Sequence, residues 1–183
     1  MKKITQALLL GILFIGCSKD DEASVPVVVA PIVTLVTYTN IELSQTANST
    51  TYGRFFSTKT GKVIKKTEVS SANGADIDIA YVGSSSSFIY FTSPDDADEN
   101  FNIPTATKSS FKNYNSGFSV ADFDSMTDDS KLKNLEVIND DNSVGTLNFP
   151  VIVTFKNAQG KKGVIKLKAS NATRLLVDIK VQK

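Results

Sequence analysis

Acidic residues between positions 95 and 99 have the types and the spacing to bind a hard cation. From Asp96 to Asn102, every second residue carries a side-chain oxygen, as do the first ligands of a calcium-binding loop. That loop requires Gly at its sixth position and Glu at its twelfth, but Phe101 and Thr107 stand there, so an EF-hand is excluded. We therefore predict a looser surface Ca²⁺ site, with a solvated acidic loop as the alternative. Its ligands would be Asp95, Asp96, Asp98 and Glu99.

Other carboxylates raise two further options. Asp140 and Asp141 form a second short acidic stretch that is open to the same two interpretations. A pair of carboxylates can also hydrolyse a glycoside without any histidine. Carboxylates two residues apart in a strand normally face solvent, however, and nothing in the sequence places a pair across a cleft. Hydrolysis of glycans therefore stays an alternative function, with these candidate residues: Asp76, Asp78, Asp122 and Asp124.

Several chemistries are excluded by composition. The chain has no histidine and one cysteine, Cys17, which removes Ser-His-Asp and Cys-His catalysis and imidazole-ligated zinc. Two S-x-x-K matches, at 109–112 and 130–133, and the K-T-G at 59–61 are typical of penicillin-binding proteins. Their order is reversed here, and the chain is too short for that fold. We therefore predict no catalytic residue.

Strand patterns dominate the folded part. Three consecutive strands are predicted at residues 149–156, 163–169 and 175–181. Turns at 157–160 and 170–173 join them, and Gly160 in the first turn can adopt positive φ. Ile165 and Leu167 would face inward, with Lys166 and Lys168 outward. Residues 32–38, 77–81 and 88–92 predict further strands, the second with Ile77, Ile79 and Tyr81 inward. The fold class is therefore α+β dominated by antiparallel β-sheet, with a C-terminal β-meander.

Helices are predicted to be few and short. Ser119 or Asp122 could cap a turn that ends at Met126, and Thr127 could cap a helix over 128–135. A third helical turn is expected over 67–73, ended by Gly74.

Charge is balanced overall but unevenly placed. Without residues 1–16, which contain two lysines, the chain has 18 basic and 19 acidic residues, so it has no general attraction to nucleic acid. Residues 94–141 contain 11 acids and four lysines, whereas residues 156–183 contain eight basic residues and one acid, Asp178. The basic strands could meet an anionic surface, or their lysines could protect an exposed sheet from aggregation.

The N-terminus predicts export. Lys2 and Lys3 precede the apolar run Ala7–Ile15 and the small residue Gly16, as in a secretory signal peptide. The run is far shorter than the roughly 20 residues that cross a bilayer.

Residues 14–17, Phe-Ile-Gly-Cys, resemble a bacterial lipobox. The resemblance implies that Cys17 becomes the first residue of the mature chain and carries acyl chains such as palmitate, which anchor it to the membrane. The residues that follow resemble the export signal of surface-exposed lipoproteins of the Bacteroidota. That resemblance implies a position on the cell surface at the outer membrane, and it rests on Lys19, Asp20, Asp21 and Glu22.

The folded part is also similar to a recurrent lipoprotein domain of the same bacteria, which has no assigned activity and gives no functional residues. That similarity rests on residues 55–63, 77–81, 93–96 and 160–168. Asp124-Ser125-Met126 resembles a short O-glycosylation motif of exported proteins in this phylum, which would place Ser125 at the surface.

Together these observations predict a signal peptide (1–16), an acylated cysteine and tether (17–31) and a single globular domain (32–183). Whether Val27–Val29 belong to the tether or to the fold stays open. The predicted function is that of a surface-anchored lipoprotein, a non-catalytic binding or accessory module. Its partner would be an outer-membrane transporter or a surface glycan, and Ca²⁺ the candidate cofactor. The alternatives are a small carboxylate-dependent hydrolase and a purely structural envelope protein.

Overall fold

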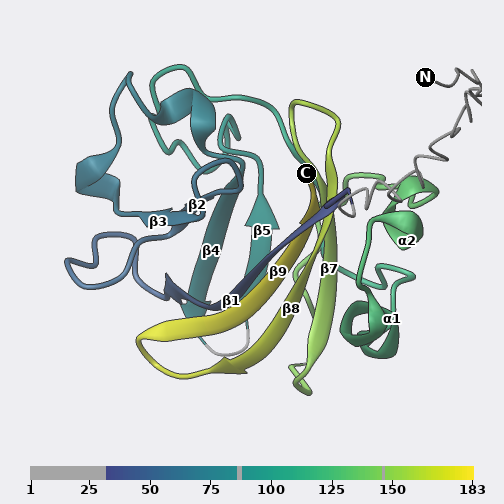
Figure 1. The fold of residues 1–183 in the computed structure, drawn as a ribbon. Coiled ribbons are helices and arrows are strands. Elements are labelled where there is room, and N and C mark those ends of the chain that lie inside the picture. The colour runs from purple at the N-terminus through teal and green to yellow at the C-terminus, as the bar shows by residue number, and fades with distance from the viewer. Residues whose placement is uncertain (1–31, 86–87, 146) are drawn as a thin grey trace, which may run out of the picture. The chain divides into compact units, whose positions relative to one another are not determined.

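Antiparallel sheets form most of the folded part of the chain. The structure, a computed structural model, describes residues 32–85, 88–145 and 147–183. Residues Ile32–Lys183 form one compact unit with two sheets, two short α-helices and two single turns of 3₁₀-helix. The predicted α+β class dominated by antiparallel sheet is therefore confirmed (Figure 1).

The larger sheet has the strand order β1-β9-β8-β7-β6. Its last three strands in the chain, β7, β8 and β9, pair with their sequence neighbours, so the predicted C-terminal meander is confirmed. Gly160, in the turn between β7 and β8, has φ 79°, the left-handed conformation that the sequence predicts there. The strands are β1 (Leu35–Ser44), β6 (Ser110–Lys112), β7 (Val151–Lys156), β8 (Lys162–Ser170) and β9 (Arg174–Gln182).

The alternation predicted for β8 is confirmed. Ile165 and Leu167 are fully buried on the inner face, while Lys166 and Lys168 point to the other side and stay partly exposed. The inner face of β9 is lined in the same way by Leu175, Val177, Ile179 and Val181.

The smaller sheet has the order β3-β2-β4-β5. The half-exposed alternation predicted over residues 77–81 is wrong, because Asp78 is 3% exposed and Ala80 is 0% exposed. The loop at 93–109 covers Ala80 and also Ile77, which therefore lies in the outer cluster and not on the predicted inner face. Asp78 is covered by Thr58 and by Asn157 of the β7–β8 turn. The strands are β2 (Phe55–Ser57), β3 (Lys62–Ile64), β4 (Ile79–Ser85) and β5 (Phe88–Thr92).

The main core lies between the two sheets. Phe111 of β6 stacks on Phe155 of β7, with ring centroids 5.9 Å apart, and on Phe91 of β5 at 6.4 Å. The β5 and β6 edges are also joined by the amide of Asn113, which donates to Phe91 O at 2.9 Å and accepts from Phe91 N at 2.8 Å. The rings and the amide together fix β5 against the larger sheet.

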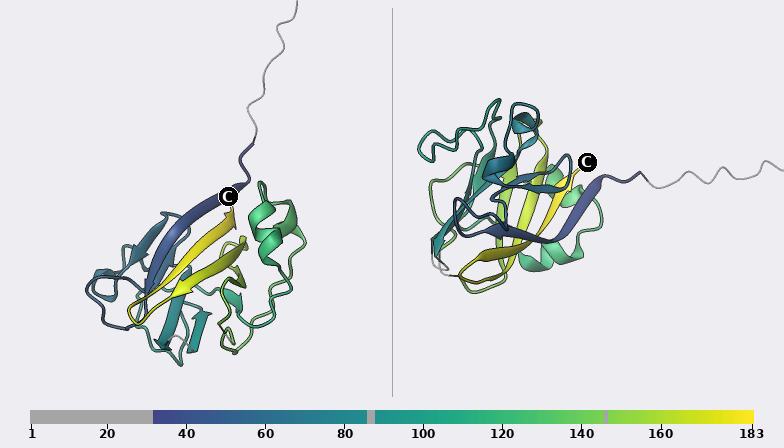
Figure 2. Two further views of the ribbon diagram at one scale, coloured as in Figure 1. Left: turned by 90° about the horizontal axis from the view of Figure 1, so that it is seen from below. Right: turned by 90° about the vertical axis from the view of Figure 1, so that its left-hand side faces the viewer.

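Helices α1 (Val120–Ser125) and α2 (Ser130–Lys133) cover the outer face of the larger sheet (Figure 2). Ser119 caps α1 as predicted and accepts a hydrogen bond from Asp122 N at 3.0 Å. The predicted cap at Thr127 is wrong, since α2 begins after Asp129. Phe123 and Leu132 anchor the two helices to the sheet.

The loop at 93–109 covers the outer face of the smaller sheet. Phe101 and Ile103 pack there against Phe55, Ile77 and Ala80 in a separate hydrophobic cluster. No continuous helical segment covers 67–73, where the 3₁₀ turn η1 (Lys66–Glu68) overlaps only the start of the expected range and η2 (Gly74–Asp76) follows it. Gly74 does end a turn, because its N–H donates to Ser70 O at 2.9 Å, and it also begins η2.

Candidate functional site

A hollow of about 560 Å³ lies on the outer side of β5, next to the start of β6. It is bordered by the loop at 93–99, the residues 108–110 and the segment 139–143. We call it the acidic hollow because six described carboxylate side chains line it. They are Asp95, Asp96, Asp98, Glu99, Asp140 and Asp141.

Alternation along β5 supplies the aromatic side of the acidic hollow. Ile89 and Phe91 are 1% exposed and point into the core, so Phe88, Tyr90 and Thr92 face the other way. Phe88 is 50% exposed, and its ring meets the Tyr90 ring edge-on at 5.6 Å between centroids. These rings were not predicted as part of a site, although the period-two pattern of the strand indicates that they share one face.

The loop at 93–99 is ordered by its own carboxylates. Asp96 accepts hydrogen bonds from the Thr92 hydroxyl and, at 2.9 Å, from Asp98 N. The Ser93 hydroxyl donates to Asp95 and accepts from Ser109 N at 2.8 Å, which ties the loop to the start of β6. The predicted calcium ligands are therefore held in one short turn beside β5.

The second acidic stretch reaches the same hollow from the other side. Asp140 N donates to Phe111 O at 2.9 Å, and the Asp140 carboxylate accepts from Asn113 N at 3.0 Å and from Tyr114 N at 3.1 Å. Asp141, the next residue in the chain, also lines the hollow. The sequence identified the two acidic stretches separately, and the structure brings them together.

Negative charge in the acidic hollow is largely uncompensated. None of its six carboxylates forms an ion pair with any residue that the structure describes, and Lys108 is the sole basic side chain in the described lining. Arg54 interacts with Glu99 electrostatically from outside the lining. Tyr90 donates its hydroxyl hydrogen to Glu99, and burial together with this bond raises the pKa of Tyr90 above its ordinary value.

Ser109 is a polar group without a partner in the lining. Its side chain is 3% exposed, and its hydroxyl makes no hydrogen bond to any described residue. A buried unsatisfied hydroxyl costs about 1–3 kcal/mol.

No ready-made metal site is present among the described residues, where no group of three or more Asp or Glu side chains is arranged to hold a metal ion. Calcium binding by Asp95, Asp96, Asp98 and Glu99 therefore stays a prediction.

Of the four hydrolase candidates, Asp76 and Asp78 share one cavity. They line a space of about 600 Å³ at the turns between β2 and β3 and between β7 and β8. Burial raises the pKa of Asp78, while Asp76 pairs with Lys59 at 2.8 Å. The expectation that both carboxylates face solvent is wrong for Asp78.

The other two candidates, Asp122 and Asp124, are held in α1 by lysines. Asp122 pairs with Lys131 at 2.6 Å, and Asp124 pairs with Lys166. Ser125 is exposed, and its hydroxyl donates to Ala121 O at 2.8 Å, so the predicted glycosylation position lies at the surface of α1.

Two lysines of the basic strands β8 and β9 bond to the helices. Lys180 donates to Phe123 O at 2.9 Å and to Met126 O at 2.8 Å, and Lys162 donates to Lys133 O at 2.6 Å. β8 and β9 are interior strands of the sheet. Neither interpretation of the basic C-terminal segment describes these lysines, because the fold uses them to hold α1 and α2.

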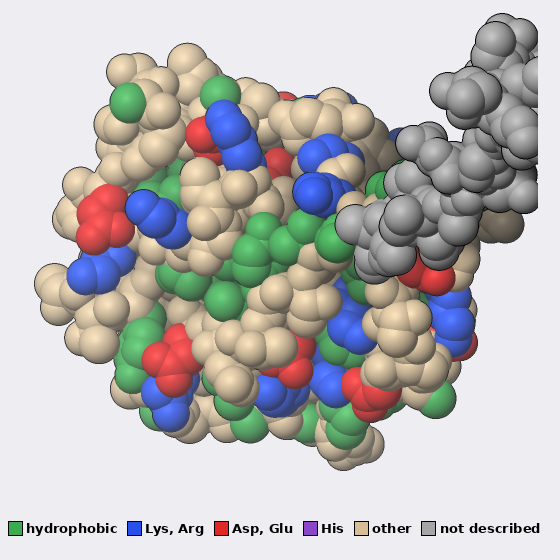
Figure 3. Space-filling model, in the orientation of Figure 1, with side chains coloured by type: hydrophobic (Ala, Val, Ile, Leu, Met, Phe, Trp, Pro, Cys, Tyr) green, Lys and Arg blue, Asp and Glu red, His purple; other side chains and the backbone are tan. Residues whose placement is uncertain are grey.

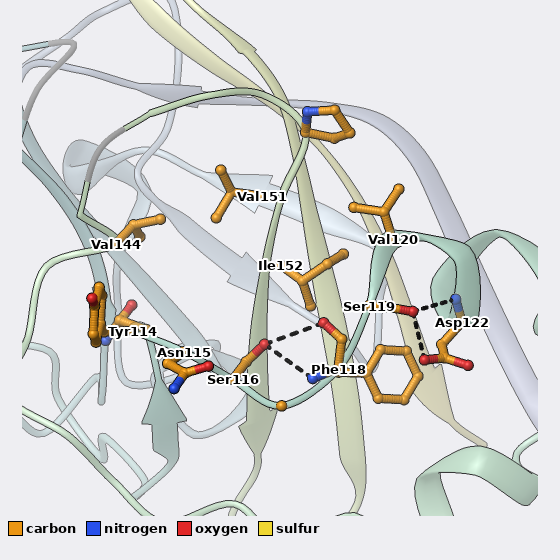
Figure 4. A pocket seen from close by; sticks show the side chains of 13 residues that line it. Tyr114, Asn115, Ser116, Phe118, Ser119, Val120, Asp122, Val144, Val151 and Ile152 are labelled. Carbon is orange, nitrogen blue, oxygen red and sulfur yellow. Dashed lines mark hydrogen bonds between the residues drawn. The ribbon is translucent and has the colours of Figure 1, made fainter.

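A shallower groove of about 590 Å³ runs beside Tyr114, which is 57% exposed (Figure 4). The two serine hydroxyl groups of this groove are bonded locally. Ser116 bonds to the backbone of Phe118, and Ser119 bonds to Asp122. The groove therefore offers few free polar groups, and it serves below as a control surface.

The predicted lipid and export residues lie outside the described residues, as do Val27–Val29. These residues are Cys17, Lys19, Asp20, Asp21 and Glu22. In the part of the chain that the structure describes, no helix has the length and hydropathy needed to cross a membrane.

Comparisons with known proteins identify a fold but no family. No family model matches the chain, and no curated protein matches it. The crystal structure of a DUF4466 family protein from Parabacteroides merdae is similar, with a TM-score of 0.60, 16% sequence identity and coverage of 83% of this chain. The chain spans about half the length of that structure, 55% of it. At this identity the likeness concerns the fold alone, shared with a protein of the Bacteroidota whose family name denotes unknown function.

Proposed function

We propose that the chain is a lipoprotein of the outer membrane, anchored through Cys17 and exposed at the cell surface. The lipobox-like and Lys/acid patterns of residues 14–22 support this location, and the fold is shared with a protein from the same phylum. Its folded part is a non-catalytic binding or accessory module. It works beside a partner such as an outer-membrane transporter or a surface glycan.

One observation carries the binding function. The acidic hollow gathers six carboxylates that form no ion pair with the described residues, and two aromatic rings lie beside them. Carboxylates and aromatic faces both attract cations. The ligand group bound there carries positive charge, and Ca²⁺ is the simplest such ligand.

Photo-crosslinking on intact cells tests this function. A photoreactive phenylalanine at position 88 lies in the acidic hollow, and one at Tyr114 lies in the groove with nearly the same exposure, 50% against 57%. We expect a specific crosslinked product from position 88 only, and we expect the double change Asp95→Asn with Asp141→Asn to remove it. Equal labelling from both positions would refute a binding function at the hollow.

The anchor has its own test. Mass spectrometry of the mature N-terminus should find a diacylglycerol thioether on Cys17, and protease added to intact cells should digest the chain. Cys17→Ala should abolish both the lipid and the surface exposure. Recovery of the unchanged precursor or of protein in the inner membrane alone would contradict the proposed location.

A second candidate function rests on Asp76 and Asp78. In this hypothesis Asp78, whose pKa burial raises, would be the general acid, and Asp76, paired with Lys59, would be the ionised carboxylate. Turnover of a glycan that Asp78→Asn abolishes would establish it. Absence of turnover across a broad glycan panel would eliminate it and leave the binding function intact.

A further inference from the structure

The cavity beside Asp78 is built differently from the acidic hollow. It encloses about 600 Å³ where β1, the turns β2–β3 and β7–β8, the 3₁₀ turn η2 and the end of β9 converge. We call it the Asp78 cavity. In the orientation of Figure 1, hydrophobic side chains gather in the middle of the visible surface, with lysine, arginine and acidic side chains around them (Figure 3).

An aromatic ring of fixed orientation lines the Asp78 cavity. The Tyr38 ring meets Phe56 edge-on at 5.2 Å between centroids, and its hydroxyl donates to Thr58 O. Gly61 lies against the same ring, since a Cβ there would be 2.7 Å from Tyr38 Cε1 and its φ is 68°. Three contacts therefore hold the ring in place without a ligand.

The two carboxylates of the Asp78 cavity both have hydrogen-bond partners, whereas the acidic hollow has no ion pair with the residues that the structure describes. Asp76 takes two hydrogen bonds from Lys59 Nζ, at 2.8 and 3.1 Å. Asp78 accepts from Thr58 N at 2.8 Å and from the Thr58 hydroxyl, and the Asn157 side chain also hydrogen-bonds it. Neither carboxylate of the cavity is therefore left without a partner for a free cation to bind.

Free polar groups border the apolar part of the cavity. The side chains of Gln159 and Lys161 are exposed in the β7–β8 turn and form no hydrogen bond or ion pair with the described residues. Val36, Tyr38 and Ala75 contribute carbon surface to the lining. Pockets of this volume with a mainly apolar wall and a few polar groups are typical of small-molecule sites.

From this arrangement we infer that the Asp78 cavity binds a short neutral saccharide. A sugar ring presents C–H groups to an aromatic surface and hydroxyl groups to amide, ammonium and carboxylate groups around it, which matches Tyr38, Gln159, Lys161 and Asp78. The inference goes beyond the proposed cation-binding function, because it uses none of the residues of the acidic hollow. It requires binding alone and stands with or without turnover.

NMR titration of the full chain in non-ionic detergent tests the inference, with cellotriose and the N-acetylglucosamine trimer as neutral probes and trigalacturonate as an acidic probe. We expect saturable shifts of the Gln159 side-chain amide and of the Tyr38 ring with at least one neutral probe. Shifts confined to the Tyr114 groove, tighter binding of trigalacturonate than of both neutral probes, or no saturable shift with any probe would overturn the inference.

Variants locate the site without endangering the fold. Gln159→Ala and Lys161→Ala change exposed side chains, and together they should weaken binding roughly tenfold. Tyr38→Phe should retain binding, because it keeps the ring. Tyr114→Ala, in the groove, should change nothing, and unaltered binding in the Gln159/Lys161 double variant would overturn the inference. Cation binding to the acidic hollow is measured in a separate titration, so each of the two proposed sites can be disproved without the other.

Discussion

The acids of α1 and α2 and those of the acidic hollow come from neighbouring parts of the sequence, yet their surroundings differ. In the helices, Asp122, Asp124 and Asp129 each pair with a lysine. In the hollow, no carboxylate has such a partner among the residues that the structure describes. The helical acids thus contribute to the attachment of α1 and α2, whereas the carboxylates of the hollow are available to bind a cation.

This difference separates structural charge from charge that is available to a ligand. Like charges crowded without partners repel one another, so the acidic hollow should cost stability that a bound cation would restore. For the ring, lysine and acid variants, each variant therefore has a counterpart in the other region, with an expected difference in size or sign.

Removal of an aromatic ring should give the largest contrast in stability. Phe123 is 3% exposed between α1 and the sheet, so Phe123→Ala should lower the free energy of unfolding by about 3–5 kcal/mol. Phe88 in the hollow is 50% exposed, and Phe88→Ala should change it by about 0.5 kcal/mol or less. Equilibrium denaturation in urea measures both, and equal losses would show that the rings do not differ in role.

Replacing one lysine in each region should give the next largest difference in stability. Lys180→Met removes two hydrogen bonds to the carbonyls of Phe123 and Met126 and should lower the free energy of unfolding by about 2 kcal/mol. Lys108→Met in the hollow should lower it by only about 0.2–0.5 kcal/mol, because it removes the basic side chain of the described lining from among the acids, and it should strengthen cation binding for the same reason. Denaturation and calorimetric titration of both variants check this pair, and weaker cation binding by Lys108→Met would contradict it.

Neutralising one acid in each region should change the free energy of unfolding in opposite directions. Asp124→Asn removes the ion pair with Lys166 and should lower the free energy of unfolding by about 0.5 kcal/mol. Asp141→Asn relieves repulsion in the hollow and should raise it by roughly 0.2–0.5 kcal/mol. Both effects should shrink in 1 M salt, where the Debye length is about 3 Å. Thermal unfolding at low and high salt measures them, and effects of the same sign would refute the comparison.

The pH dependence of stability should also distinguish two carboxyl groups. Hydrogen bonds from Lys131 and Ser119 lower the pKa of Asp122 from 3.8 to about 2, so its contribution is present above pH 3.8 and is lost as pH falls toward 2. Burial raises the pKa of Asp78, so its contribution is present below pH 3.8 and is lost as pH rises through the raised value. Carboxyl NMR titration gives both midpoints. Asp122→Asn and Asp78→Asn should each remove their own part of the stability profile.

Local sequence patterns correctly predicted those parts of the fold in which the interacting residues are close together in the sequence. The inward positions of Ile165 and Leu167 follow from alternation in a hairpin, and the Ser119 cap follows from its own turn. Asp78 departs from the predicted solvent face because Thr58 and Asn157, which are distant in the sequence, hydrogen-bond its carboxylate. Alternation shows which side chains share a face but not what covers it.

The candidate site depended on contacts that are distant in the sequence. Asp95 and Asp141 lie on the same hollow only because β5 and β6 come together, and no periodicity predicts that approach. Lys166 compensates Asp124 across 42 positions of the chain. The sequence therefore predicted which residues are acidic and in loops, whereas the fold decides which of them remain unpaired.

The most direct test of the account is an NMR titration of the full chain in non-ionic detergent, first with CaCl₂ and then with 1,3-diaminopropane. We predict saturable shifts at Asp96, Asp98 and Asp141 with at least one of the two cations. These shifts should be lost in the double variant Asp95→Asn with Asp141→Asn and kept in the control Asp122→Asn with Asp124→Asn. No saturable shift with either cation, or the same response in both double variants, would contradict the acidic hollow as a binding site.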